Sequence, residues 1–313
     1  MPNKSAMFPI RRVDQTQSED IEYLGTKRKF WFTVDGKRFL FKAEERGTGE
    51  DWAEKVVCEL ARLLGLPHIE YELAHEYEGG KSIQPGVICP SFVPRPLVLI
   101  LGNQLLYVRD PQYPVKSAVK YGVSAHTVEA VAAVLSFLHA PLPVWMENAP
   151  AGISTALGVF VGYVMLDAWV ANQDRHHQNW GAILDGSQIS LAPTYDHGAS
   201  LARNLTDEER KSRLETRDQN QSLEHFASRA RSGFYHAIQD KKTLSTLDVF
   251  RHFAQLDPDA AKIWLAKLAV IGSDVVDAIL AEVPPQRMSP ITRQFTLALL
   301  NINQRRLLLE FLS

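Results

Sequence analysis

The chain has only two cysteines and no excess of either charge. Its 313 residues contain Cys58 and Cys89 as the only cysteines, and its formal net charge is −2. Two cysteines in apolar runs indicate reduced core thiols and exclude a disulfide framework, so we expect a cytoplasmic protein. Without a basic excess, we expect no direct nucleic-acid partner and no membrane partner.

Long hydrophobic runs are also scarce. The first nine residues, Met-Pro-Asn-Lys-Ser-Ala-Met-Phe-Pro, contain no signal-peptide apolar stretch. A membrane-spanning helix needs about 18 or more consecutive apolar residues, and no run outside 151–171 approaches that length. Glycine, serine, threonine and aspartate interrupt 151–171. The apolar segment 156–171 therefore predicts a buried helix, in a chain long enough for two lobes.

The most informative pattern that is present begins at Asp174. The stretch 174–179 reads Asp-Arg-His-His-Gln-Asn, and Asp196 follows shortly after it. In phosphoryl transfer, the first aspartate can accept a proton from an attacking hydroxyl, and the asparagine and second aspartate can hold Mg²⁺ against the phosphates of ATP. An aspartate and asparagine at this spacing alone are often only a turn or a helix cap. All three residues together predict a phosphotransferase.

A predicted hairpin explains how these residues would meet. Two apolar runs, 180–184 and 187–191, are joined by Asp185-Gly186, which is a strong hairpin signal. Asn179 precedes the first run and Asp196 follows the second, so the turn places both at the same end. Two oxygen ligands then converge, as a hard cation requires.

The same residues carry a resemblance to a known family. The stretch 172–180, Asn-Gln-Asp-Arg-His-His-Gln-Asn-Trp, and the stretch 191–196, Leu-Ala-Pro-Thr-Tyr-Asp, resemble the catalytic core of HipA-like serine/threonine kinases. The spacing is also similar to that of phosphatidylinositol 3- and 4-kinases. The resemblance implies that Asp174 is the catalytic base, that Asn179 and Asp196 bind Mg²⁺, and that His176 belongs to the ATP site.

The resemblance also implies an architecture and a cellular role. It implies a two-lobe, protein-kinase-like α+β fold with a small β-rich N-lobe, 1–93, and a larger, mostly helical C-lobe, 94–313. The role common in the family is bacterial toxin–antitoxin growth control, with a translation factor as protein substrate and an antitoxin as partner. Because Lys42 lies so near the start, we expect the compact form without the family's extra N-terminal subdomain.

An ATP-binding lobe is expected upstream of the catalytic motif. Two β-rich runs, 30–34 and 39–43, flank a turn over 35–38, Asp-Gly-Lys-Arg. Lys42 lies in the second run, where an unpaired ammonium would be costly unless it reached water. The predicted helix 51–64 offers Glu54 and Glu59 as partners. The register against HipA-like kinases favours Glu54, as a strand lysine pairs with a helix glutamate in kinase ATP sites.

Two further segments are assigned to the nucleotide. The stretch 23–29 occupies the place of a phosphate-covering loop, but with one glycine it does not match a glycine-rich or Walker A motif. Gly25, Thr26 and Lys27 are its candidate phosphate contacts, and an exposed basic turn is the alternative interpretation. By resemblance, Thr26 is a candidate for self-phosphorylation. Segment 85–93 predicts the last strand and the adenine hinge, with Cys89 and Phe92 as hinge residues.

The remaining segments are interpreted from pattern alone. We expect a strand over 68–74, irregular structure over 97–115, and a solvated loop with a short helix over 203–224. Arg229 and Arg231 follow, and either surface ion pairs or a phosphate contact would suit them. Adjacent His176 and His177 have too few neighbouring ligands for zinc. The helical spacings in the C-terminal third are 245–256, 258–271, 274–283 and 290–312.

Two other classes of protein remain open from the sequence. A lipid or small-molecule kinase would use the same catalytic residues, but the mixed-charge stretch 203–224 does not favour membrane docking. A non-catalytic regulatory protein on a kinase-like scaffold is the third alternative. The presence of Lys42, Asp174, Asn179 and Asp196 together argues against it.

Overall fold

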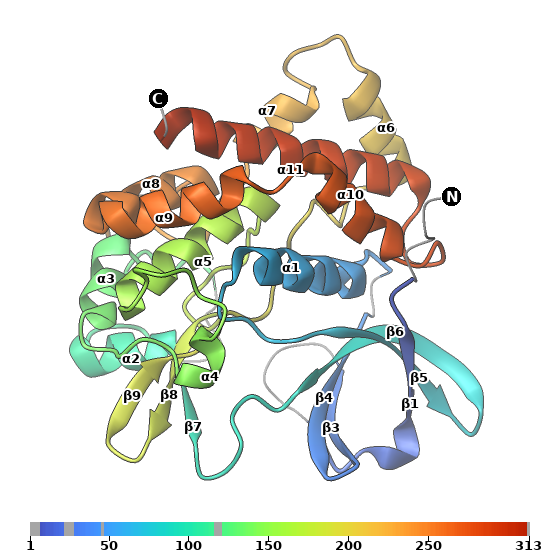
Figure 1. Cartoon of the computed structure of the whole chain (residues 1–313), viewed down its shortest axis with the longest axis horizontal. Helices are drawn as coiled ribbons and strands as arrows, with labels where there is room; N and C mark the ends of the chain where they lie inside the picture. The colour runs from blue at the N-terminus through green and yellow to red at the C-terminus, as the bar shows by residue number, and fades with distance from the viewer. Residues whose placement is uncertain (1–6, 22–27, 45–46, 116–120, 312–313) are drawn as a thin grey trace.

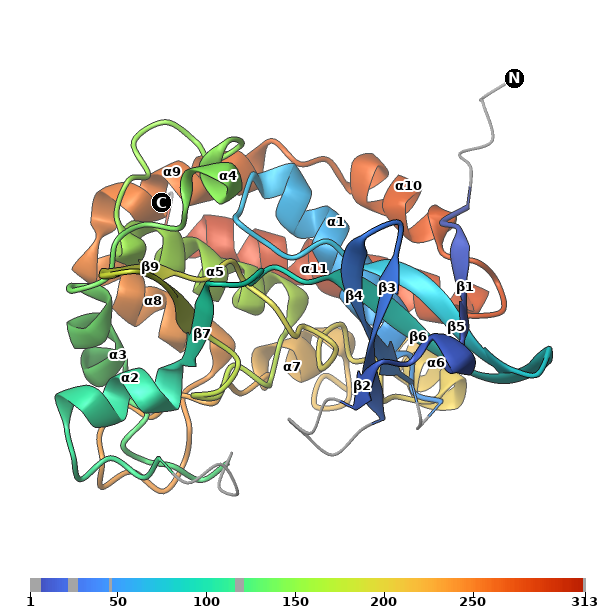
Figure 2. The same cartoon turned by 90° about the horizontal axis from the view of Figure 1, so that it is seen from below.

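The computed structural model of the chain describes residues 7–21, 28–44, 47–115 and 121–311. Two lobes are seen in Figure 1, a strand-rich one and a larger helical one. Helix α1 (Glu50–Leu64) lies between the strands of the smaller lobe and the C-terminal helices, and it contacts both. Figure 2 shows α2 (Gly102–Arg109) and α3 (Val128–Leu135) at the opposite end of the molecule from the strands of the smaller lobe.

A six-stranded sheet forms the smaller lobe, in the order β1-β5-β6-β4-β3-β2. Only β1 and β5 pair in parallel; the other neighbours are antiparallel. The turn between β3 and β4 is Asp35-Gly36, whose φ values of 50° and 72° match the tight turn that such pairs favour. The predicted pair of strands around Lys42 is therefore confirmed. The strands are β1 (Ile10–Asp14), β2 (Asp20–Ile21), β3 (Lys29–Val34), β4 (Lys37–Ala43), β5 (Glu72–Glu78) and β6 (Lys81–Pro90), with a short 3-10 helix, η1 (Gln15–Gln17), after β1.

Helix α1 confirms the helical spacing predicted over 51–64. Its apolar residues are buried except Leu63, and the helix packs against β5 and β6. It ends at Gly65, whose φ of 76° lies in the left-handed region that glycine tolerates best. A Cβ at this position would lie 2.1 Å from the carbonyl oxygen of Asn148. Both the backbone angle and the close approach therefore require glycine.

A buried helix, α5 (Ala156–Val170), forms the centre of the larger lobe. Only Leu157 escapes full burial, which confirms the buried helix predicted from the continuous apolar run. The hydroxyl of Thr155 caps its start by accepting from Gly158 N at 2.9 Å. Helices α8, α9 and α11 contact it. The other helices are α2 (Gly102–Arg109), α3 (Val128–Leu135), α4 (Pro143–Met146), α6 (Asp207–Glu215), α7 (Leu223–Ser228), α8 (Thr246–Leu256), α9 (Pro258–Ala269), α10 (Ser273–Glu282) and α11 (Pro290–Phe311).

The two proline-marked helix starts have the expected capping side chains. Asp257 accepts from Ala260 N at 3.0 Å before Pro258, and Ser289 accepts from Thr292 N at 3.1 Å before Pro290. At these two positions an aspartate or serine before proline marks a helix start, whereas Asp110-Pro111 is followed only by a turn.

The prediction of irregular structure over 97–115 is wrong. Strand β7 (Val98–Leu101) leads directly into α2, and β7 pairs with β8 (Gly181–Asp185). A strand of four residues joined to a helix of eight is too short for either periodicity to be recognised in a sequence window. Strand β7 is fixed by its pairing with β8, some 80 residues away in the sequence.

The hairpin that follows the catalytic motif is confirmed, with a shifted turn. Strand β8 pairs antiparallel with β9 (Gln188–Leu191), and the last pair is Asp185 with Gln188. The turn residues are therefore Gly186 and Ser187 instead of Asp185 and Gly186. Glycine supplies the positive φ, 58°, that the turn requires.

The strand predicted over 68–74 begins later than expected. Strand β5 starts at Glu72, and His68 makes only an isolated bridge with Thr194. Residues before Glu72 connect α1 to the sheet and bond across to the other lobe: Ile69 N donates to Thr194 O at 3.1 Å. The alternation there reflects burial between the lobes, and not membership of the sheet.

No helix in the described part of the chain has both the length and the apolar character needed to cross a bilayer.

Gly65 provides a test of the packing at the end of α1. We expect Gly65→Ala to lower the free energy of unfolding by about 2–4 kcal/mol, because it adds an overlap with the Asn148 backbone to the strain of a left-handed alanine. The measurement is urea denaturation. The matched control is Gly79→Ala, which also has a positive φ, 54°, but open space around the added Cβ, and should cost only about 1 kcal/mol. Equal losses would contradict the close approach.

Candidate active site

A cleft of about 480 Å³ lies between the two lobes. Residues from β4, α1, β6 and β7 line it, together with the loops on either side of the β8–β9 hairpin. Gly25, Thr26 and Lys27 lie outside the described residues, so the predicted phosphate-covering loop stays a prediction. Every other predicted site residue lines this cleft: Lys42, Glu54, Cys89, Phe92, Asp174, His176, Asn179 and Asp196.

Lys42 makes ion pairs with two carboxylates. Its Nζ lies 2.7 Å from Glu54 Oε1 and 2.6 Å from Asp196 Oδ1. Glu59, the other candidate on α1, pairs with Lys55 and Arg62 instead. Burial opposes the charge on Lys42, but Asp196 and Glu54 outweigh it and raise the pKa of Lys42 well above its usual value. The lysine therefore stays cationic inside the cleft.

Asp196 lies in a strained turn just after β9. Its φ of 61° is unusual for a residue with a side chain. The next residue, His197, donates its backbone N–H to Glu54 Oε2 at 2.9 Å. Glu54 therefore binds the strand lysine through one oxygen and the loop through the other. This arrangement fixes the Asp196 carboxylate beside Lys42.

Asp174 and Asn179 are fixed to each other by short contacts. Asn179 Nδ2 donates to the carbonyl oxygen of Asp174 at 2.7 Å, and Asp174 N donates to Asn172 Oδ1 at 3.1 Å. Since its amide nitrogen is used in this way, Asn179 offers its Oδ1 to a cation. Tyr121 donates its hydroxyl to Asp174 Oδ1 at 2.7 Å.

A buried arginine, Arg175, holds the loop that carries Asp174 and Asn179. Arg175 Nε lies 2.7 Å from Asp167 Oδ2 and its Nη2 lies 2.9 Å from Oδ1; Nη1 donates to the carbonyl of Asn179 at 2.7 Å. Burial opposes the charge, but Asp167 prevails and raises the pKa of Arg175. Sequence reasoning did not single out this pair. The signal was a lone aspartate inside the apolar run 156–171, which requires a buried partner.

His197 connects the two charge networks and was also missed. Its Nε2 lies 2.8 Å from Thr194 Oγ1 and 3.2 Å from Arg175 Nη2. Burial and then the charge on Arg175 lower the pKa of His197 well below its usual value. The neutral ring accepts at Nε2 while its backbone N–H binds Glu54.

His176 and His177 orient the loop, as expected of adjacent histidines without further ligands. His176 Nδ1 accepts from Gln178 N at 3.1 Å, and His177 Nδ1 lies 2.8 Å from the hydroxyl of Tyr113. Segment 97–115, predicted as irregular, adds support here: Asn103 N donates to the carbonyl of His177 at 2.7 Å. Helix α2 therefore holds the loop that carries Asp174 and Asn179.

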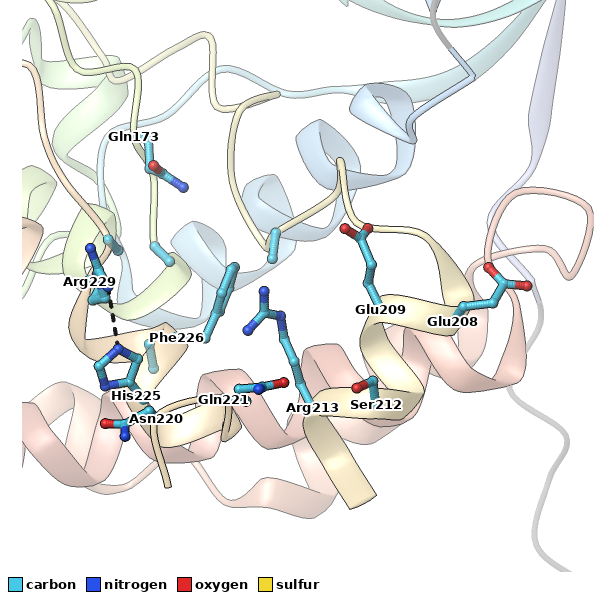
Figure 3. A pocket seen from close by; sticks show the side chains of 14 residues that line it. Gln173, Glu208, Glu209, Ser212, Arg213, Asn220, Gln221, His225, Phe226 and Arg229 are labelled. Carbon is cyan, nitrogen blue, oxygen red and sulfur yellow. Dashed lines mark hydrogen bonds between the residues drawn. The ribbon is translucent and has the colours of Figure 1, made fainter. Parts of the chain in front are cut away.

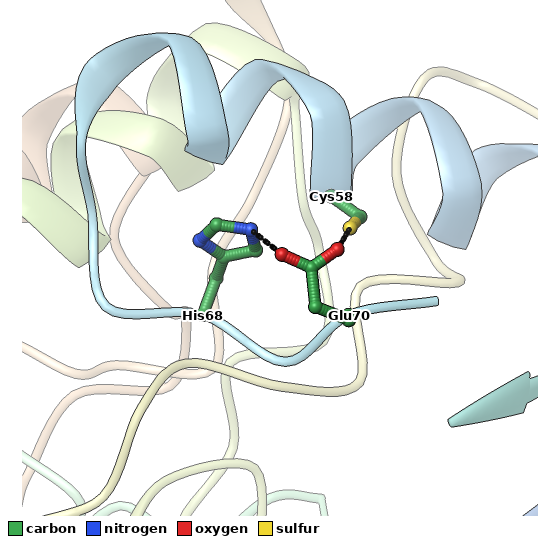
Figure 4. Close-up of side chains that lie close together, drawn as sticks. All are labelled: Cys58, His68 and Glu70. Carbon is green, nitrogen blue, oxygen red and sulfur yellow. Dashed lines mark hydrogen bonds and ion pairs between the residues drawn. The ribbon is translucent and has the colours of Figure 1, made fainter. Parts of the chain in front are cut away.

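A separate group of potential metal ligands lies beneath α1 (Figure 4). Cys58, His68 and Glu70 converge there, with Cys58 Sγ 3.6 Å and His68 Nε2 3.3 Å from the Glu70 carboxylate. Arg62 already pairs with Glu70, and its Nη2 lies 3.9 Å from the sulfur. Burial raises the pKa of Cys58 to about 11. An arginine cation and a protonated thiol are unfavourable for a metal, so we assign this group a structural role.

The other end of the cleft is apolar. Cys89 lies on β6, and burial raises the pKa of its thiol to about 12, so it remains neutral. Phe92 packs against Tyr195 with ring centroids 5.7 Å apart. Leu99 and Leu101 of β7 also line this end. A flat aromatic group fits between such side chains.

No protein-family model and no curated protein matches the sequence, but solved structures share the fold. The chain has the fold of the Helicobacter pylori proinflammatory kinase CtkA. The two are 18% identical, the similarity covers 96% of this chain and 99% of that one, and the TM-score is 0.62. The predicted two-lobe, kinase-like α+β fold and the resemblance seen in the motif are confirmed at the level of the fold.

A further similar structure is HipA of Shewanella oneidensis MR-1, solved as a toxin–antitoxin complex with HipB and operator DNA. It is 11% identical, and the similarity covers 96% of this chain and 67% of that chain with a TM-score of 0.49. The lobe boundary predicted at residue 93 stays a prediction.

A second cavity, of about 740 Å³, lies beside the cleft between α6 and α7 (Figure 3). Gln173 lines both cavities, so they adjoin next to Asp174. The Arg213 guanidinium lies over the Phe226 ring, 4.7 Å from its centroid, and both side chains line the cavity. Its lining combines charged and polar side chains with Phe226 and four alanines.

The Asp167–Arg175 pair provides a test of the support below the loop. We expect Asp167→Ala to lower the free energy of unfolding by about 3–5 kcal/mol, because Arg175 then stays buried without its carboxylate. The measurement is chemical denaturation followed by circular dichroism. Asp185→Ala, at an exposed position of the hairpin, should change stability by less than about 0.5 kcal/mol. A loss for Asp167→Ala as small as that of the control would disprove the supporting role.

Proposed function

We propose that the chain is an ATP- and Mg²⁺-dependent serine/threonine protein kinase of the HipA-like type. The observation that carries the proposal is the convergence of Lys42, Glu54 and Asp196 on one side of the cleft with Asp174 and Asn179 lining the same cleft. A strand lysine paired to a helix glutamate beside a metal-binding aspartate is the arrangement that kinases use. The fold shared with a kinase supports the same conclusion.

The nucleotide would bind across the cleft. Its adenine fits the apolar end near Cys89, Phe92 and Leu101, and its phosphates reach Lys42, which Glu54 holds in place. Asn179 and Asp196 provide amide and carboxylate oxygens, the ligand types that Mg²⁺ prefers. When bound there, Mg²⁺ would neutralise charge on the phosphate oxygens.

Asp174 is the base in the proposed transfer. Its carboxylate accepts the proton of the acceptor hydroxyl as the hydroxyl oxygen forms a bond to the γ-phosphorus. The bond from the γ-phosphorus to the β–γ bridging oxygen breaks, and ADP leaves. The hydrogen bonds from Asp174 N to Asn172 and from Asn179 to the Asp174 carbonyl keep this carboxylate facing the cleft.

A protein is the acceptor class that the second cavity favours. It adjoins the cleft at Gln173 and is large enough for several side chains of an extended segment. The neighbouring helix α6 is strongly polar, unlike a lipid-docking element. By resemblance we propose a translation factor as the substrate, an antitoxin as a partner and a cytoplasmic location.

The base and the metal ligand can be tested separately. We expect Asp174→Asn to keep the fold and to reduce phosphoryl transfer by about 10²–10⁴-fold, since general-base catalysis is lost. We expect Asp196→Ala to lose Mg·ATP binding, seen as no thermal shift with the nucleotide. Asp185→Asn, outside the cleft, should keep both properties. Undiminished transfer by Asp174→Asn, or a strong thermal shift by Asp196→Ala, would overturn the respective assignment.

The acceptor cavity has its own test. We expect Arg213→Ala to raise the KM for a protein acceptor about 10-fold, through loss of a charge-assisted contact, and to leave the KM for ATP unchanged. Arg217→Ala is the matched control, because Arg217 is exposed and does not line the cavity. Equal kinetics for both variants would place acceptor binding elsewhere.

A further inference from the structure

Tyr121 lies at the mouth of the cleft with its hydroxyl on the proposed catalytic base. Its side chain is 67% exposed, yet its hydroxyl donates to Asp174 Oδ1 at 2.7 Å. The ring meets His176 edge-on, with centroids 5.4 Å apart and an interplanar angle of 88°. The tyrosine therefore reaches the base from a loop that belongs to neither the β8–β9 hairpin nor α5.

The distance between the Tyr121 hydroxyl and Asp174 Oδ1 is short enough for proton transfer. A general base must lie within about 2.6–3.2 Å of the hydroxyl whose proton it takes. The Tyr121 hydroxyl meets that condition on the oxygen that would serve an external acceptor. We propose that Tyr121 is an intramolecular phosphoacceptor, which rests on the kinase function proposed above.

Transfer to Tyr121 would form one bond to the γ-phosphorus and break another. The phenolic proton moves to the Asp174 carboxylate while the Tyr121 oxygen forms a bond to the γ-phosphorus of ATP. The bond between that phosphorus and the bridging oxygen breaks, and ADP leaves with the electron pair. The products are ADP and phosphotyrosine, and Asp174 then returns its proton to water.

Attachment to the same chain explains why a phenol would serve in an enzyme proposed to act on serine and threonine. An external acceptor must be bound and oriented, whereas Tyr121 already has its hydroxyl at the base. Holding a reacting group in place replaces a bimolecular encounter with an intramolecular one, which is worth several orders of magnitude in rate. An external tyrosine would lack this advantage.

The phosphate would have a place to go after transfer. A phosphate dianion beside the Asp174 carboxylate is repelled. A third cavity, of about 230 Å³, is lined by Tyr121 and by Arg231. Arg231 donates to Thr243 Oγ1 at 3.3 Å and has no carboxylate partner within the described ranges. Its guanidinium can therefore bind the phosphate and draw Tyr121 away from the base.

The experiment incubates the purified full chain with Mg·ATP and maps phosphorylated residues by mass spectrometry over time. The variants are Tyr121→Phe, Asp174→Asn and, as matched control, Tyr107→Phe, which changes an exposed tyrosine on α2 away from the cleft. We expect phosphate on Tyr121 in the wild type and in Tyr107→Phe. The first-order rate constant of this labelling should stay the same over a 10-fold range of protein concentration. Asp174→Asn should lose this labelling.

The outcomes separate the inference from the proposed function. Tyr121→Phe should still transfer phosphate to an external protein acceptor while it loses the mapped site. Phosphate on external protein or on other residues, with Tyr121 unmodified, would overturn the inference and leave the kinase function standing. An apparent first-order rate constant for labelling that rises with protein concentration would indicate transfer between molecules and so overturn the inference. No consumption of ATP by the wild type would overturn both.

Discussion

The ammonium group of Lys42, which is largely withdrawn from solvent, needs negative partners, and meeting that need brings three distant segments together. Strand β4 carries the lysine, α1 carries Glu54, and the loop after β9 carries Asp196, 154 residues away in the sequence. Removing either carboxylate would weaken the compensation of a buried charge, which is costly in the low dielectric of the interior. The cleft between the lobes is therefore shaped by charge compensation as well as by apolar packing. The chain obtains a rigid position for Asp196 from the same contacts.

A second charge pair, Arg175 with Asp167, fixes the loop that carries Asp174 and Asn179. Arg175 and Asp167 hold each other inside the larger lobe, and the remaining guanidinium nitrogen fixes the carbonyl of Asn179. His197 joins this network to the first, through its ring on one side and its backbone N–H on the other. Because its pKa is lowered well below its usual value, the ring stays neutral and adds no positive charge between Arg175 and Lys42. The two networks can therefore lie close together without mutual repulsion.

The side of the cleft proposed for the acceptor is built differently from the side proposed for the nucleotide. Gln173 separates the cleft from the polar cavity between α6 and α7, and it also lines the small cavity beside Tyr121. Gln173, which directly precedes Asp174 in the sequence, thus lines all three cavities. Side chains here are more exposed: Tyr121, which bonds to Asp174 and packs against His176, is 67% exposed. Rigid charge networks therefore line the proposed nucleotide side, and more exposed side chains line the proposed acceptor side.

What the sequence could predict depended on how local each signal was. Asp174, Asn179 and Asp196 stand on either side of one hairpin, and Asp185-Gly186 located the turn of that hairpin to within one residue. Lys42 could be assigned because an ammonium in an apolar strand demands a partner. By contrast, β7 and α2 exist only because β7 pairs with β8 and α2 bonds to the loop at His177, and neither partner is near in the sequence. The contact of Tyr121 with Asp174 spans 53 residues and has no local pattern at all. Local chemistry therefore reveals the reactive groups, whereas the groups that position or regulate them emerge only from tertiary pairing.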